Sequence, residues 1–223
     1  YTTLFRRSEE RRVGKECTIA FCLAAVMCFA ANAQQALRAP QLTPFGDAQW
    51  WVLTEPLPFR IGRSREVITV PRGFVTDLAS TPRFLWSALP RTGAYMSPAV
   101  LHDYLYWDQR CARKQADEIF RIEMADFGVD ATVARLIFAA VDELGTAAWS
   151  DNAAAQNRGV TRFMPEAMLA EFLSQPFDAA STWVKFHGQI SAAGKGLPAG
   201  SDADPNRALG DTCTRAIQAH RLQ

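Results

Sequence analysis

The sequence predicts an α+β domain in which a small antiparallel sheet comes first and a packed group of three or four helices follows. Two observations support this prediction. Short runs rich in β-branched and aromatic residues, separated by Pro and Gly, occupy residues 50–75. Apolar residues then recur at helical spacing as far as residue 144. The composition is globular, since 48% of the 223 residues are hydrophobic and 21% are charged.

The predicted strands are short and lie close together in the chain. We expect them at residues 50–53, 59–61, 66–70 and 73–75, with the turn Pro71-Arg72-Gly73 before the last one. Several short strands in succession favour antiparallel pairing, because antiparallel neighbours need only tight turns between them.

The helices are predicted from their start signals, their end signals and their apolar stripes. Pro82 after two hydroxyl residues predicts a helix over residues 82–89, and Ser97-Pro98 predicts one that runs to about residue 106. Apolar stripes predict a helix over 113–127 and another that begins after Asp130 and ends at Gly145. Beyond residue 150 we expect a helix at 166–173, a strand or one helical turn at 183–186, and a mobile segment over 191–206.

The N-terminal segment predicts export. An apolar run over residues 18–31 is followed by Ala31-Asn32-Ala33 and preceded by basic residues, as in a signal peptide cleaved after Ala33. A buried apolar helix is the alternative reading of this run. Residues 1–17 resemble a translated sequencing-adapter artefact, so they take no part in the fold prediction. The run is shorter than the roughly 20 residues that a membrane span needs. Since cleavage would also remove it, we expect no stable membrane span in the mature protein.

The mature chain is expected to have three regions. Residues 34–48 form a linker, 49–150 the core domain, and 151–223 a C-terminal extension that is partly flexible. Of five cysteines, Cys111 and Cys213 remain after cleavage. They form either one disulfide or two unpaired thiols, and the sequence leaves both alternatives open.

Polar side chains concentrate in two segments of the predicted core. Asp77 lies at a strand-to-helix junction, where it either caps backbone amides or serves as an acid, base or ligand. His102 and Asp103 are adjacent on a helix and therefore point about 100° apart. Asp117 on the next helix can meet them if the two helices pack antiparallel. The candidate catalytic residues are Asp77, His102, Asp103 and Asp117.

Oxygen and imidazole ligands suit a divalent cation such as Mg²⁺, Mn²⁺ or Zn²⁺. Asp77, His102 and Asp103 are accordingly the candidate metal ligands, and a divalent metal is the one cofactor that the sequence suggests. A structural hydrogen-bonding role for the histidine is the alternative. The His-Asp dipeptide does not indicate an HD-type phosphohydrolase, because the further upstream histidines of that class are missing.

Several function classes are disfavoured. The chain has no G-x-S-x-G, P-loop, H-E-x-x-H or C-x-x-C motif. Its formal net charge of +1 provides no general attraction to nucleic acid, and we expect no nucleic-acid partner.

The chain contains the run FVTDLASTPR at residues 74–83, the run HDYLY at 102–106, and then Arg113 and Asp117. At this spacing, these residues resemble the domain of unknown function 1353 family. The resemblance covers about residues 50–145. It implies a small α+β domain that is common in phages, prophages and bacteria, without an established activity. This chain differs from many members in its export signal and in its long segment after Gly145. The resemblance adds candidate substrate-binding residues, which are Thr76, Ser80, Arg83, Tyr106 and Arg113.

Two functions remain as hypotheses. The first is an exported, periplasmic or secreted hydrolase that acts on an envelope polymer such as peptidoglycan, with Arg83 holding an anionic group. The second is a non-catalytic binding or assembly module of phage or prophage origin, with a protein partner, in which the same side chains form a structural polar network. The two differ in whether the polar residues converge on an open site or are buried.

Overall fold

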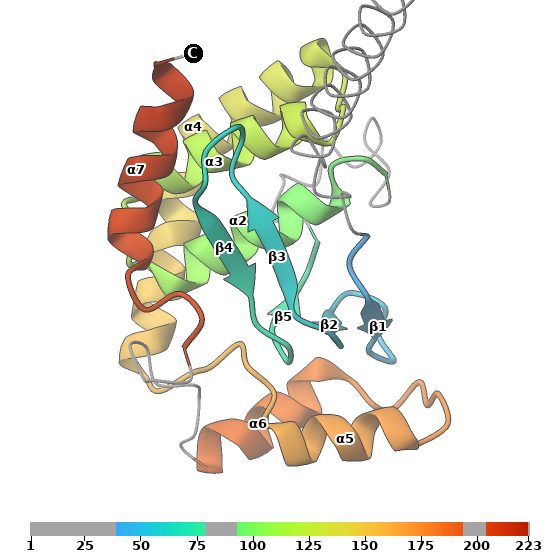
Figure 1. Cartoon of the computed structure of the whole chain (residues 1–223). Coiled ribbons are helices and arrows are strands. Elements are labelled where there is room, and N and C mark those ends of the chain that lie inside the picture. Colours follow the sequence, from blue (N-terminus) through green and yellow to red (C-terminus); the bar gives the residue numbers. More distant parts are fainter. Residues whose placement is uncertain (1–38, 79–92, 194–203, 223) are drawn as a thin grey trace, which may run out of the picture. The chain divides into compact units, whose positions relative to one another are not determined.

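The computed structural model describes residues 39–78, 93–193 and 204–222 (Figure 1), which all lie within one unit, Arg38–Gln223. Its short antiparallel strands precede its helices, which confirms the predicted α+β class. The expected signal peptide at 1–33 and the expected helix at 82–89 lie outside the described residues.

The strands form two small antiparallel sheets rather than one. β1 (Leu42–Pro44), β2 (Trp51–Leu53) and β5 (Val75–Thr76) pair in the order β1-β2-β5. β3 (Leu57–Arg60) pairs with β4 (Val67–Val70) in a hairpin. The segment expected to be a linker thus contains β1. Its Pro44 is compatible with a strand because β1 lies at the edge of its sheet, where an amide donor is not required.

A distant segment continues the first sheet next to β5. Phe74 and Phe163 form an antiparallel bridge, and the Val75 amide donates a hydrogen bond of 2.8 Å to the Arg162 carbonyl oxygen. Gly73, at φ +83°, allows this approach, because a Cβ atom there would lie 2.7 Å from the Met164 carbonyl oxygen. Residues beyond the predicted core domain therefore lie beside the strand that leads to Asp77.

The helices partly differ from prediction. α2 (Met96–Asp108), α3 (Arg113–Asp126) and α5 (Glu166–Ser174) lie where they were expected. α4 (Ala131–Asn157) begins as predicted, with the Asp130 carboxylate accepting hydrogen bonds from two backbone amides, but it continues through Gly145. α6 (Trp183–Ala193) is a full helix, and α7 (Leu209–Arg221) was not predicted. Within the described part of the chain, no helix is both long and apolar enough to cross a membrane.

α2 is the central element of the fold. All its residues from Ser97 to Trp107 are buried, and it packs against β4, β5, α3 and α4. The main core joins α2, α3 and α7 to the β3–β4 hairpin, whereas α5 and α6 pack with the first sheet through residues such as Phe45 and Trp183. Figure 1 shows α5 and α6 together on one side of the strands. Because α2 is surrounded by protein, its polar side chains require internal partners.

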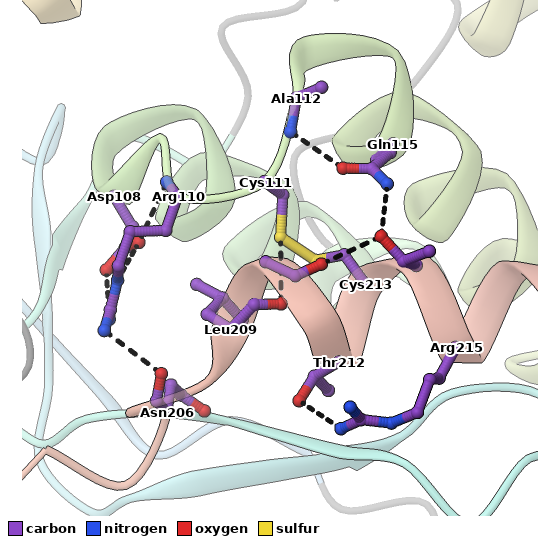
Figure 2. The surroundings of a disulfide bond; sticks show 12 residues. Asp108, Arg110, Cys111, Ala112, Gln115, Asn206, Leu209, Thr212, Cys213 and Arg215 are labelled. Atoms are coloured by element: carbon purple, nitrogen blue, oxygen red, sulfur yellow. Dashed lines mark hydrogen bonds and ion pairs between the residues drawn. A yellow bond between two sulfur atoms is a disulfide. The ribbon is translucent and has the colours of Figure 1, made fainter.

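A disulfide joins Cys111, between α2 and α3, to Cys213 in α7 (Figure 2). The Cα atoms are 6.1 Å apart, a normal separation for a disulfide. Of the two alternatives that the sequence left open, the structure therefore has the disulfide. Next to it, the Gln115 side-chain amide donates a hydrogen bond of 3.0 Å to the Thr214 hydroxyl.

Candidate functional site

α2 directs His102 and Asp103 into two separate polar networks. Successive positions on a helix point about 100° apart. His102 therefore faces α3, where Asp117 lies. Asp103 faces β5, where Thr76 lies. The two networks have different partners and different exposure.

In the first network, which we call the histidine network, three groups converge on the Asp117 carboxylate. Asp117 is fully buried, and it accepts hydrogen bonds from the Tyr106 hydroxyl at 2.6 Å and from an Arg113 Nη1 at 2.8 Å. Its Oδ1 also lies 3.1 Å from His102 Nε2. The meeting of α2 and α3 at Asp117 is what antiparallel packing of these helices was expected to produce.

His102 is held as a neutral ring. Burial lowers the pKa of His102, and the nearby Asp117 only partly opposes this effect. The ring stacks on Phe120 with 4.5 Å between ring centroids and contacts Tyr106 at 4.2 Å. A neutral imidazole can donate its Nε2–H to the carboxylate. The histidine network thus connects α2 to α3, and His102, Tyr106 and Asp117 are all buried.

In the second network, which we call the carboxyl pair, Asp103 lies beside Asp77. The Thr76 hydroxyl donates a hydrogen bond of 2.5 Å to Asp103 Oδ2, and the Leu78 amide donates one of 3.0 Å to the Thr76 hydroxyl. The Asp77 carboxylate lies close enough to Asp103 to act on it electrostatically. Asp103 is 4% exposed, whereas Asp77 is half-buried. The exposed part of Asp77 does not include its Oδ1, which is buried.

The surroundings of Asp103 favour its protonated form. Burial raises the pKa of Asp103 well above its ordinary range, and the charge of Asp77 raises it further. The nearby Arg162 has the opposite effect on this pKa but does not outweigh them. Two carboxyl groups in contact do not both ionise readily, because like charges repel in a poorly solvated place. Asp103 therefore keeps a proton more readily than an ordinary aspartate does.

Arg162 was not among the predicted site residues. Its guanidinium lies 5.2 Å from the ring centroid of Trp50 and 5.7 Å from that of Trp107. No motif marks this arginine, because only the long-range bridge next to Phe163 brings it beside β5. A basic residue close to an aromatic one in the tail is too common a pattern to identify a site.

The structure brings together some of the predicted site residues and separates others. Asp77, Asp103 and Thr76 lie together, as do His102, Tyr106, Arg113 and Asp117. Ser80 and Arg83 lie outside the described residues.

The predicted metal site of Asp77, His102 and Asp103 is not assembled. In the segments that the structure describes, no three His, Cys, Asp or Glu side chains form a group that could hold a metal ion. The helical geometry of α2 is the physical reason, because it turns His102 toward α3 and Asp103 toward β5.

The carboxyl pair can perform acid–base chemistry. One member can accept a proton while the other donates one.

A comparison with protein families finds one match. Residues 51–141 match the family model described as "Protein of unknown function (DUF1353)". No curated protein and no solved structure matches the chain. The matched segment contains the carboxyl pair and the histidine network, whereas Arg162 and Gly145 lie outside it.

Proposed function

Because the family model that residues 51–141 match has no known function, we propose a function from the site itself. The protein is an exported hydrolase that cleaves amide bonds in an envelope polymer such as peptidoglycan. The observation that carries this proposal is the carboxyl pair, in which the half-buried Asp77 lies next to an Asp103 whose pKa is raised.

In this reaction the two carboxyl groups have different roles. The Asp77 carboxylate takes a proton from the water molecule whose oxygen attacks the amide carbonyl carbon. Asp103 supplies its proton to the leaving nitrogen as the C–N bond breaks, and the pair ends with its single proton on Asp77. Thr76 holds Asp103 in place through its 2.5 Å hydrogen bond. General acid–base catalysis of this kind contributes about 10²–10⁴-fold to a rate.

The proposed location has two supports. The apolar run at 18–31 followed by Ala31-Asn32-Ala33 has the pattern of an export signal. The Cys111–Cys213 disulfide is of a kind that forms and persists in oxidising compartments. An envelope polymer with peptide cross-links offers amide bonds in such a compartment.

The test is release of amino groups and soluble fragments from isolated peptidoglycan, measured by mass spectrometry with purified protein. We expect Asp103→Asn and Asp77→Asn each to lower the rate by about 100-fold or more, because each removes one proton-transfer group. The matched control is Asp151→Asn, an exposed position on α4, which should keep the full rate. The rate should also fall as the pH rises through the raised pKa of Asp103, because the acid then loses its proton.

A second function is favoured by a specific observation. The Thr76–Asp103 hydrogen bond connects α2 to β5, and the histidine network connects α2 to α3. Such a network can serve structure alone, in a non-catalytic binding or assembly module. If the wild-type protein releases nothing from peptidoglycan, and Asp103→Asn lowers only the melting temperature, the hydrolase proposal fails and this second function takes its place.

A further inference from the structure

Arg162 is placed next to the carboxyl pair by the backbone. Its carbonyl oxygen accepts the Val75 amide hydrogen bond, so Arg162 lies opposite the strand that continues into Thr76 and Asp77. Its positive charge acts on the pKa of Asp103 and also on that of His187 in α6. The guanidinium is therefore within electrostatic reach of the proposed reaction centre.

Two indole rings hold the Arg162 side chain. Trp50 precedes β2, and Trp107 lies in the last turn of α2, so two different elements contact the guanidinium. A cation over the face of an indole is attracted by the ring electrons. This arrangement restricts the side chain before any ligand arrives, and the loss of conformational freedom on binding is correspondingly smaller.

The donors of the Arg162 guanidinium remain available. The side chain is half-buried, and among the described residues it forms no hydrogen bond or ion pair. A guanidinium presents five N–H donors in a planar fork that matches a carboxylate. Other arginines of the fold, such as Arg110 and Arg113, have carboxylate partners within the protein.

We propose that Arg162 binds a carboxylate group of the substrate, so that the substrate class is a peptide with a free carboxylate close to the cleaved amide. This inference rests on the proposed function and deepens it. The Trp50 and Trp107 rings position the guanidinium, and the carboxyl pair lies beside it. Phosphate is an anion of similar size, and the experiment separates the two.

The experiment is a binding titration followed by NMR, on the full chain carrying Asp103→Asn so that no ligand is consumed. The probes are N-acetyl-D-alanyl-D-alanine, the same dipeptide with a C-terminal amide, and inorganic phosphate. The arginine Nε–H and tryptophan indole N–H signals report binding at Arg162. We expect the carboxylate form to bind about tenfold to a hundredfold more tightly than the amide, the range for a hydrogen bond to a charged group.

A second substitution assigns the effect to Arg162. Adding Arg162→Gln should abolish the preference for the carboxylate, and Arg162→Lys should keep only part of it, because an ammonium lacks the planar fork. The control is Arg158→Gln, an exposed arginine at the end of α4, which should change nothing. Circular dichroism melting curves verify that all variants are folded.

Several results would overturn the inference. These are equal binding of the dipeptide and its amide, a carboxylate preference that survives Arg162→Gln, binding of phosphate as tight as that of the carboxylate, or no binding of any probe. The hydrolysis assay fails or succeeds separately. If peptidoglycan is not cleaved but the Arg162-dependent preference is found, only the proposed function falls.

Discussion

At the scale of single residues, Glu123 in α3 is the most unusual acidic group outside the site. It is 2% exposed, and its Oε1 has no hydrogen-bond partner among the described residues. Burial, together with the charge of Asp126, raises the pKa of Glu123 from its ordinary value of 4.5 to about 8, although the Gly62 amide opposes the rise. The folded protein therefore keeps this carboxyl group protonated at neutral pH.

This carboxyl group should make stability fall with rising pH. Between pH 4.5 and about 8 the unfolded chain loses the proton while the folded protein retains it, so the unfolded state is favoured progressively. The total effect is on the order of 3–5 kcal/mol in the free energy of unfolding. Glu123→Gln should remove the share of the pH dependence that Glu123 contributes, while the share from Asp103 remains, as measured by urea unfolding at pH 5 and pH 9. The control Glu143→Gln, exposed on α4, should retain the full pH dependence; an unchanged slope in Glu123→Gln would contradict the assignment.

The sequence could identify most of the polar residues of the site but not their grouping. Asp77, His102 and Asp103 stand in recognisable runs, and helical geometry already indicated that the last two diverge. Which partner each one meets depends on how α2 packs, and that is a tertiary property. Arg162 could not be predicted, because its neighbours Trp50 and Trp107 are more than 50 residues away in the chain.

At the scale of elements, Gly145 explains why α4 is longer than predicted. Gly commonly ends a helix, since it tolerates the left-handed backbone of a cap. Here it is buried within α4 for a different reason. A Cβ atom at this position would lie 2.2 Å from the Tyr106 hydroxyl oxygen and 3.2 Å from an Arg113 Nη1. The absence of a side chain lets α4 approach the histidine network closely.

Gly145→Ala should therefore destabilise the protein, although alanine favours a helix by about 1 kcal/mol. The added methyl group must displace Tyr106 or Arg113, and overpacking of this kind costs about 1–3 kcal/mol. Chemical denaturation measures the change. Gly188→Ala in α6 is the matched control, because a Cβ atom there meets nothing within 4 Å, and it should be neutral or stabilising. Equal stabilisation by both substitutions would show that the close approach at Gly145 is absent.

The remaining differences between predicted and observed elements have separate physical causes. β1 is short and ends in a proline, so only pairing with β2 makes it a strand. α7 has buried residues at helical spacing, Leu209, Cys213, Ala216 and Ile217, but the composition of the preceding segment favoured flexibility. α2 and α3 were predictable because their start and end signals lie in the sequence itself.

At the scale of the whole molecule, the C-terminal segment is an integral part of the fold. Asn206 is buried; its side-chain oxygen accepts a hydrogen bond of 2.9 Å from the Thr69 amide of β4, and its Nδ2 donates one of 2.8 Å to the Tyr104 hydroxyl of α2. Arg110 forms an ion pair with Asp204 at 2.5 Å. α7 then packs against α3 and β4. The extension predicted to be partly flexible thus completes the main core with its last helix.

Removing the disulfide should show how much this bond stabilises the fold. The two cysteines are 102 positions apart, and closing a loop of that length stabilises a protein by about 2–5 kcal/mol, chiefly by restricting the unfolded chain. The double variant Cys111→Ser, Cys213→Ser should lose stability in that range in thermal and urea unfolding. A reductant should lower the stability of the wild type but leave the double variant unchanged. Equal sensitivity of both proteins to the reductant would mean that the bond is not the cause.

The same bond determines what happens when the backbone is cut. α3, α4, α5 and α6 all lie between the two cysteines, and so does Arg162, whereas Asp77 and Asp103 precede the first cysteine. A protease that nicks the chain anywhere between them therefore releases no fragment until a reductant is added. A nick between Cys111 and Arg162 would separate Arg162 from the carboxyl pair along the backbone, but the disulfide would keep both within one covalent molecule.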